Sequence, residues 1–375
     1  MVKEFLINTL SNVTLGPSIT ASMRLGYEKI TLQKYLKCRS RIKRIKIESK
    51  KPAVNRDGAP DFDNKQIVQV NAPLALISQI QRSGGSLLSQ LFDGHPQLHA
   101  HPHELKMGYP KKYYWPELDL SDTPERWFFL LFEDIVITHS KEGFKKSDKS
   151  DYTHPFQFMP SKQKKIFLHY VESKFPLQLR DVFDAYMTSY FNAWMDNNNL
   201  TNGPKKFITA FTPRMAMFKK NMDHFKKIYP DGKLISIVRD PKNWFPSAFH
   251  HRKKDYGDLS NAIDLWKENA NAMIRNKEVF GENFCIIRFE DLIAKMESAM
   301  RYLSRFLNIE YNDILLAPTF NGSPISANTS FKLEKSKIIK STLSRYKTLD
   351  SERLKAIDSM TSDLYKIVLD KTVNF

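Results

Sequence analysis

The segment LALISQIQRSGGSLL, residues 74–88, joins an apolar run of strand length to a glycine-rich turn and then to a second apolar segment. In that second segment, apolar side chains recur at the spacing of one helix face: Leu87, Leu88, Leu91 and Phe92. Gly94 and Pro96 then supply a stop after about three helical turns. The pattern predicts a β-strand, a turn large enough to hold a phosphate, and an α-helix.

The turn is suited to an anion. Gly84 and Gly85 let the backbone approach a ligand closely, and the N–H groups at the start of the helix favour negative charge. Ser83 and Ser86 add hydroxyl donors. The P-loop signature of kinases and ATPases, GxxxxGK[ST], is missing because no lysine follows the glycines. The turn is therefore either a phosphate site without that lysine or an ordinary tight turn between a strand and a helix.

A second strand and turn follow at residues 233–247. The run KLISIV predicts a buried strand, and Asp240 and Pro241 suit the N-cap and the first position of the next helix. Arg239 ends the strand and Ser247 follows eight residues later. A guanidinium fork and a hydroxyl suit a phosphate dianion. The alternative is a capped surface helix with an exposed arginine.

Together with a third segment, these motifs resemble those of the sulfotransferases, nearest to the branch that contains bacterial and tyrosylprotein sulfotransferases. The motifs are, in chain order, QRSGGSLL at residues 81–88 with DGHP at 93–96, VRD at 238–240, and RFEDL at 288–292 with the loop that follows it. The resemblance extends over roughly residues 74–335. It implies a P-loop-like α/β fold and the cofactor PAPS, with PAP as the product.

The resemblance also implies residue roles. The first loop would cradle the 5′-phosphosulfate, Arg239 and Ser247 would hold the 3′-phosphate, and a later loop would close over the cofactor. The cofactor-binding residues implied in this way are Arg82, Ser83, Gly84, Gly85, Ser86, Leu87, Arg239, Ser247, Asn328 and Thr329.

Sulfuryl transfer needs a grip on the phosphosulfate, a cation near the oxygen that leaves, and a base for the acceptor proton. Arg82 is the predicted cation, because it adjoins the glycines and stays charged at any working pH. Related enzymes place a catalytic glutamate or histidine just past the first helix. We therefore predict Glu104 as the base, with His103 as the second candidate.

The alternation of His99, His101 and His103 suggests a metal site if this segment is a strand, because alternate residues of a strand face one side. Pro96 and Pro102 instead indicate a loop. Sulfuryl transfer itself requires no metal. We therefore expect none.

The remaining pattern predicts a parallel sheet with helices on both faces and ligands beyond the carboxyl ends of its strands. Strands are expected near residues 74–80, 207–211, 234–238 and 284–288, and helices at 124 onward, 176–194 and 212–227. The predicted organisation is a basic extension at residues 1–70, an α/β domain at 71–340 with a largely helical insertion at about 109–203, and C-terminal helices at 341–375. The insertion is a natural cap over an acceptor.

Composition limits the kinds of partner that the chain could bind. The 375 residues carry a net charge of +17, and residues 34–51 hold nine basic side chains against the single acid Glu48. That arm is either simply solvated or attracted to an acidic saccharide, an anionic membrane surface or nucleic acid. Zinc-finger spacing and RNP motifs are missing, so nucleic acid is not expected. Cys38 and Cys285 cannot build a disulfide framework, and the sequence shows neither a signal peptide nor a run of 18 apolar residues, which indicates a cytoplasmic protein.

The sequence thus predicts a bacterial, PAPS-dependent sulfotransferase that works in the cytoplasm or at the cytoplasmic face of a membrane. It would transfer a sulfuryl group to a hydroxyl or amine of a small molecule, carbohydrate or glycolipid. A P-loop kinase-like phosphotransferase and a basic, non-catalytic nucleic-acid-binding protein are the alternatives.

Overall fold

The computed structural model describes residues 66–106, 114–144, 154–325, 333–334, 337–338 and 340–374. All of them belong to the second of two units into which the chain divides, residues 55–375. The basic arm at residues 34–51 lies outside the described residues, as do Asn328 and Thr329.

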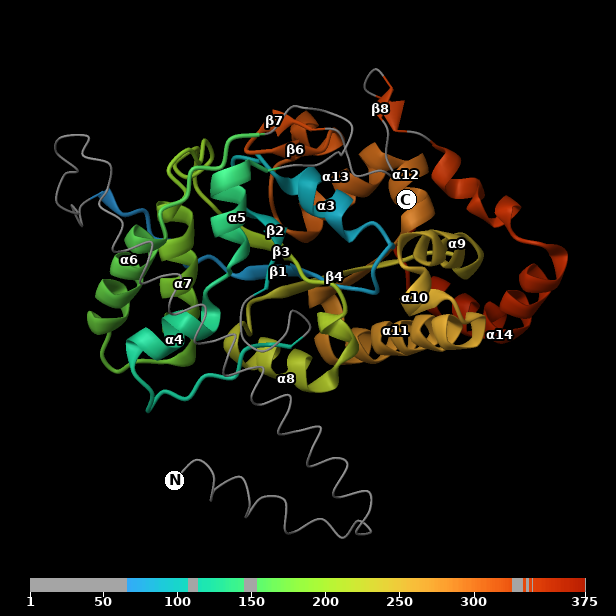
Figure 1. Cartoon of the computed structure of the whole chain (residues 1–375), viewed down its shortest axis with the longest axis horizontal. Coiled ribbons are helices and arrows are strands. Elements are labelled where there is room, and N and C mark those ends of the chain that lie inside the picture. The colour runs from blue at the N-terminus through green and yellow to red at the C-terminus, as the bar shows by residue number, and fades with distance from the viewer. Residues whose placement is uncertain are drawn as a thin grey trace, which may run out of the picture. The chain divides into compact units, whose positions relative to one another are not determined.

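A five-stranded parallel sheet forms the centre of this unit (Figure 1). Its strands are β1 (Leu74–Ile77), β2 (Leu98–Glu104), β3 (Phe207–Phe211), β4 (Lys233–Val238) and β5 (Phe284–Arg288), in the spatial order β2-β3-β1-β4-β5. Every pairing is parallel, so the five carboxyl ends lie at one edge of the sheet. The four predicted strands and the predicted α/β fold class are confirmed.

Helices cover both faces of the sheet (Figure 1). On one face lie α3 (Gly85–Phe92), α12 (Phe289–Ala294), α13 (Met296–Phe306) and the 3-10 helix η4 (Asp313–Leu316). The side chains that they bury alternate along the strands, as Ile77, Ile235 and Ile287 illustrate. Helices α8 (Lys219–Ile228) and α11 (Leu259–Phe280) lie across the other face. On that same face, α7 (Leu179–Ala193) packs aromatic side chains against the edge strand β2.

Strand β2 corrects the prediction of a loop. It lies at the edge of the sheet and pairs only with β3, and its register shifts between Ala100 and Glu104. Pro102 lies inside that irregularity, where its missing N–H does not remove a hydrogen bond between the strands. Proline at an edge irregularity is compatible with a strand, so the two prolines were misleading.

Among the described residues between β2 and β3 there are four helices, and further helices follow β3. The four are α4 (Pro124–Leu131), α5 (Ile135–Glu142), α6 (Pro160–Glu172) and α7. The others are α9 (Pro241–His251), α10 (Lys253–Tyr256), α14 (Ser351–Leu369) and the 3-10 helices η2 (Met215–Met217), η3 (Gly281–Asn283) and η5 (Lys340–Thr348). Two short hairpins are β6 (Thr319–Phe320) with β7 (Ser323–Pro324), and β8 (Leu333–Glu334) with β9 (Lys337–Ile338). The single helix predicted over residues 212–227 is instead η2 followed by α8.

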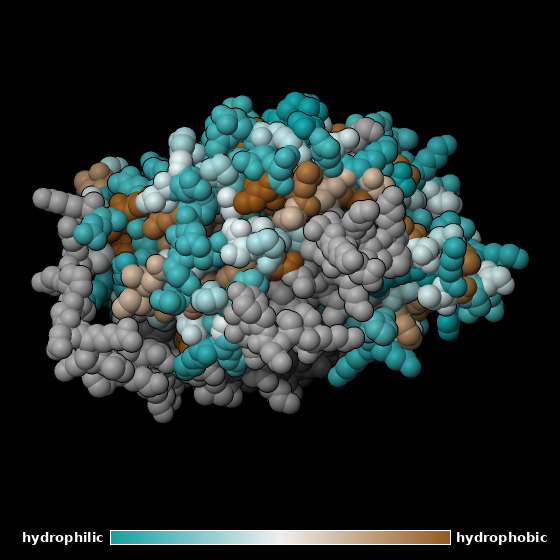
Figure 2. All heavy atoms as spheres, turned by 90° about the horizontal axis from the view of Figure 1, so that it is seen from above, coloured by the Kyte–Doolittle hydropathy of each residue, from teal (hydrophilic) through white to brown (hydrophobic). Residues whose placement is uncertain are grey.

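Among the residues that are coloured in Figure 2, polar side chains are the more common on the surface, with apolar ones between them. Within the ranges that the structure describes, no helix combines the length and the apolar character that a membrane crossing requires.

Helix α3 packs tightly on β3 because its first residue is glycine. A Cβ atom on Gly85 would lie 2.2 Å from the Phe211 ring and 2.3 Å from Nε2 of Gln79. We expect Gly85→Ala to lower the free energy of unfolding by about 1–3 kcal/mol through overpacking. Urea unfolding measures the change.

Ser86→Ala is the matched control, because it places alanine at the next helical position without that conflict. It should change the free energy of unfolding by less than about 0.5 kcal/mol. Equal stability of the two variants would contradict the packing derived for Gly85.

Candidate active site

The loop between β1 and α3 is sharply bent. Arg82 and Gly84 both have positive φ angles, +69° and +96°. A side chain on Gly84 would also collide with Phe289, since its Cβ would lie 2.7 Å from that ring. The first helical hydrogen bond runs from Leu88 N–H to the Gly84 carbonyl, so the preceding N–H groups of α3 have no helical acceptor. These donors lie at the carboxyl edge of the sheet, where an anion would meet them.

Neighbouring turns hold this loop in place. Arg239 Nη1 donates to the carbonyl oxygen of Arg82 at 2.8 Å, and Trp244 Nε1 donates to that of Gln81 at 2.8 Å. Arg214, which follows β3, donates from Nε to Oε1 of Gln81 at 2.5 Å and from its backbone N–H to the Gln79 carbonyl at 2.9 Å. Donors from the segments that follow the neighbouring strands β3 and β4 therefore fix the shape of the loop.

The structure brings together the two turns that the sequence assigned to the cofactor. Arg82 Nε lies 3.4 Å from Ser247 Oγ, although the two residues are 165 positions apart. Ser247 and Arg239 are buried, and the Arg239 guanidinium stacks on the Phe289 ring at 4.3 Å. The predicted proximity of the two turns is confirmed, because β1 and β4 are hydrogen-bonded neighbours.

A third arginine, Arg345, joins this group. It lies on η5, which is tied to α9 by a hydrogen bond of 3.1 Å from the Tyr346 N–H to Oδ1 of Asn243. Burial lowers the pKa of Arg345, and burial followed by the charge of Arg345 lowers that of Arg82. The pKa of Arg239 falls to about 9, mainly through burial, with Glu290 opposing the shift and both other arginines adding to it. Sequence reasoning missed Arg345, since no motif surrounds it.

Beneath the loop lie buried polar groups with no hydrogen bond in the described structure. They are the Ser83 hydroxyl and both atoms of the Gln79 side-chain amide. Buried groups of this kind are rare in folded proteins and indicate a ligand or ordered water. The predicted loop residues Ser83, Gly84, Gly85, Ser86 and Leu87 thus line a site with surplus donors.

Glu104 and His103 lie on opposite faces of β2. Glu104 pairs in register with Phe211, whose ring touches Gly85, so this carboxylate lies on the α3 side of the sheet, near the loop. Its side chain is 31% exposed and lies 3.7 Å from the Lys106 ammonium. This position is open to an acceptor, as a base requires.

The His103 side chain faces the helical insertion and is only 7% exposed. Its ring lies against those of Tyr190 and Phe156. Burial lowers the pKa of His103 to about 3. An acceptor reaches Glu104 more readily than this enclosed imidazole.

Glu133, which precedes α5, gathers several donors and was missed by the sequence prediction. His101 Nε2 lies 2.9 Å from it, and it accepts from the Lys106 N–H at 2.6 Å and the Tyr186 hydroxyl at 3.1 Å. Burial acts to raise the pKa of Glu133, but the charges and hydrogen bonds of His101 and His103 outweigh it and hold the pKa below its ordinary value.

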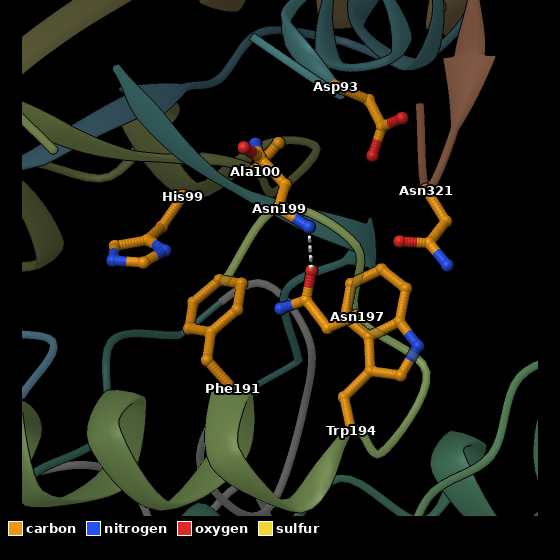
Figure 3. A pocket seen from close by; sticks show the side chains of 8 residues that line it. All are labelled: Asp93, His99, Ala100, Phe191, Trp194, Asn197, Asn199 and Asn321. Carbon is orange, nitrogen blue, oxygen red and sulfur yellow. Dashed lines mark hydrogen bonds between the residues drawn. The ribbon is translucent and has the colours of Figure 1, made fainter. Parts of the chain in front are cut away.

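A small pocket lies elsewhere, between β2 and the end of α7, with Asp93 after α3 and Asn321 of the β6–β7 hairpin also in its wall (Figure 3). Its volume of about 10 Å³ is close to the minimum for one water molecule. Asp93 closes it by accepting bonds from the Thr319 hydroxyl at 2.8 Å and the Gly322 N–H at 2.9 Å. Burial, followed by the Lys205 charge, lowers the pKa of His99 in its wall to about 3. The pocket is too small for an acceptor.

Comparison with known proteins gives a family. Residues 73–313 match the model described as "Sulfotransferase family". Protein-tyrosine sulfotransferase 1 of Danio rerio is 31% identical over 101 residues, which are 26% of this chain and 28% of that protein. Protein-tyrosine sulfotransferase A of Caenorhabditis elegans is 24% identical over 102 residues, 26% of this chain and 27% of that protein. The match thus spans little more than a quarter of these relatives.

Among solved structures, the sulfotransferase domain from the curacin biosynthetic pathway is similar with a TM-score of 0.43 and 18% identity, over 79% of this chain and 99% of that one. The family model covers well over half of the chain. The chain therefore belongs to the sulfotransferase family.

Proposed function

We propose that this sulfotransferase uses PAPS and moves its sulfuryl group to a hydroxyl or amine acceptor, releasing PAP. The proposal rests on one observation: the 81–85 loop, which contains Arg82, lies beside Arg239 and Arg345 at the carboxyl edge of β1 and β4. Three mutually repelling guanidinium groups beside a row of helix N–H groups form a site for a ligand with several negative charges. Carbohydrates and glycolipids are the proposed acceptor class. Tyrosyl peptides should be tested beside them, because two relatives are protein-tyrosine sulfotransferases.

The residues fit such a cofactor in two places. The N–H groups of Gly85, Ser86 and Leu87, with the Ser83 hydroxyl, would hold the 5′-phosphosulfate. Arg239 and Ser247 would hold the 3′-phosphate, with Arg345 adding charge from η5. Contacts from Asn328 and Thr329 remain part of the proposal.

The chain would supply two functions to the transfer itself. Glu104 would take the proton of the acceptor hydroxyl as its oxygen bonds to sulfur. Arg82 and the α3 N–H groups would stabilise the negative charge on the phosphate oxygen as its bond to sulfur breaks. Family membership favours this reaction over the phosphotransferase alternative. A cytoplasmic location and an anionic partner for the 34–51 arm also remain predictions.

Removal of either 3′-phosphate contact should weaken PAP binding. We expect Arg239→Ala and Ser247→Ala each to lose about 1–3 kcal/mol of binding free energy in calorimetric titration, because each removes a charge-assisted hydrogen bond. Arg301→Ala is the control, since that exposed arginine on α13 pairs with Glu297. Unchanged affinity in the first two variants, or tighter binding of ADP than of PAP by the wild type, would refute the assignment.

Arg345→Ala should affect stability and binding in opposite directions. Without ligand, the variant should be at least as stable as the wild type, because a charge that repels Arg82 and Arg239 is gone. Its affinity for PAP should nevertheless fall by about 1–3 kcal/mol. Thermal unfolding with and without PAP measures both quantities. A variant that is destabilised and binds PAP normally would show that Arg345 is a structural residue only.

Glu104→Gln should separate chemistry from cofactor binding. Turnover, measured as PAP released in the presence of a panel of saccharides, glycolipids and tyrosyl peptides, should fall at least about a hundredfold because the base is lost. PAP affinity should stay unchanged. Full turnover in Glu104→Gln would move the role to His103 or another group.

A further inference from the structure

We propose that His101, His103 and Glu133 bind one divalent transition-metal ion, with Zn²⁺ as the occupant, and that this ion ties the carboxyl end of β2 to the start of α5. The potential ligand atoms of these residues all lie within 4.8 Å of one another. His101 Nε2 is 2.9 Å and His103 Nε2 is 3.6 Å from the Glu133 carboxylate oxygens. Ligand atoms of a tetrahedral zinc ion lie roughly 3.4 Å apart, so small side-chain rotations suffice.

The geometry of His101 suits a metal ion between its ring and Glu133. Its Nδ1 lies 2.9 Å from the His103 carbonyl oxygen, and its Nε2 faces a carboxylate oxygen. A neutral imidazole carries one donor and one acceptor, so with Nδ1 donating, the Nε2 lone pair faces an oxygen lone pair. Either a second proton or a metal ion removes this conflict. Donation of the remote ring N–H to a backbone carbonyl is the usual arrangement for a histidine that binds a metal.

The surroundings of His103 also favour a metal ion at this place. Its side chain is 7% exposed, and its nearest polar partner, Oε1 of Glu133, lies 3.6 Å from Nε2, which is too far for a good hydrogen bond. The hydrogen bond between His101 and Glu133 leaves both ring nitrogens of His103 without one. An ion at the centre of the three residues would use His103 as well.

The surroundings orient the carboxylate and exclude water. Glu133 is held by the Lys106 N–H and the Tyr186 hydroxyl, an arrangement typical of a metal-binding carboxylate. The rings of Tyr190 and Phe156 lie against the two histidines, with centroid distances of 4.8 Å from Tyr190 to His101 and 6.4 Å from Phe156 to His103.

Two imidazoles and one carboxylate suit Zn²⁺. A water molecule or the His139 ring, whose centroid is 5.3 Å from that of His103, would supply the fourth position. The enclosure indicates a structural ion. Because Glu104 directly follows His103, the ion would also fix the strand end that carries the proposed base.

Metal analysis of the full-length protein tests the proposal. The protein is treated with a chelator, then titrated with ZnSO₄, and bound zinc is measured by mass spectrometry after gel filtration. We expect about one ion per chain in the wild type and loss of that ion in His103→Gln and Glu133→Gln. The matched control is His99→Gln, a buried histidine on the same strand whose ring packs on Phe191. It should keep the ion.

Three results would overturn the site: no zinc retained by folded wild type, equal retention in all variants, or loss in the control alone. If the two site variants do not fold, the wild type decides. Titration with Co²⁺ should give the strong visible absorption of a four-coordinate ion, and the weak spectrum of hydrated Co²⁺ would refute the site. PAP affinity, measured in parallel, reports on the proposed function separately, because the metal ligands face the opposite side of β2 from the cofactor loop.

Discussion

The hydrogen bond from Arg239 to the carbonyl oxygen of Arg82 joins the two turns on which the site depends. It is available because β1 and β4 are parallel neighbours whose carboxyl ends are level. The same guanidinium stacks on Phe289, so two contacts fix its position. A buried cation is unfavourable unless it is compensated, and Glu290 is the acid that acts on Arg239 most strongly. A bound polyanion, such as the proposed cofactor, would complete that compensation.

The sequence was informative wherever a buried parallel strand ended in a functional turn. The apolar runs that became β1, β3, β4 and β5 were readable, and the proximity of Arg82 to Arg239 followed from the geometry of parallel sheets. Strand β2 was not predicted, because Pro96 and Pro102 indicated a loop in spite of the alternating histidines, and the strand forms by pairing with β3. The roles of Arg345 and Glu133 could not be predicted from the sequence either. Each comes from a segment without a motif and joins its site only through tertiary packing of η5 or α5.

The two-residue period of β2 separates two kinds of chemistry that are adjacent in sequence. His103 turns toward α7 and the insertion, where aromatic rings enclose it. Glu104 turns toward α3 and remains partly exposed beside the cofactor loop. The sequence prediction named both as candidates for one role, because related enzymes place a glutamate or histidine in this region, and it interpreted the segment as a loop. A strand removes that freedom, so their different environments follow directly from the corrected secondary structure.

The origin of the positive charge explains how this loop can lack the lysine of a P-loop. In a P-loop that lysine is local, so the loop carries its own cation. Here Arg82 is the cation of the loop itself, and Arg239 and Arg345 add two more through the β1–β4 pairing and the packing of η5 on α9. No short segment of the chain can therefore form the anion site alone. The proposed site is complete only when the sheet and the C-terminal segment have assembled, so it depends on the packing of a region that carries no recognisable motif.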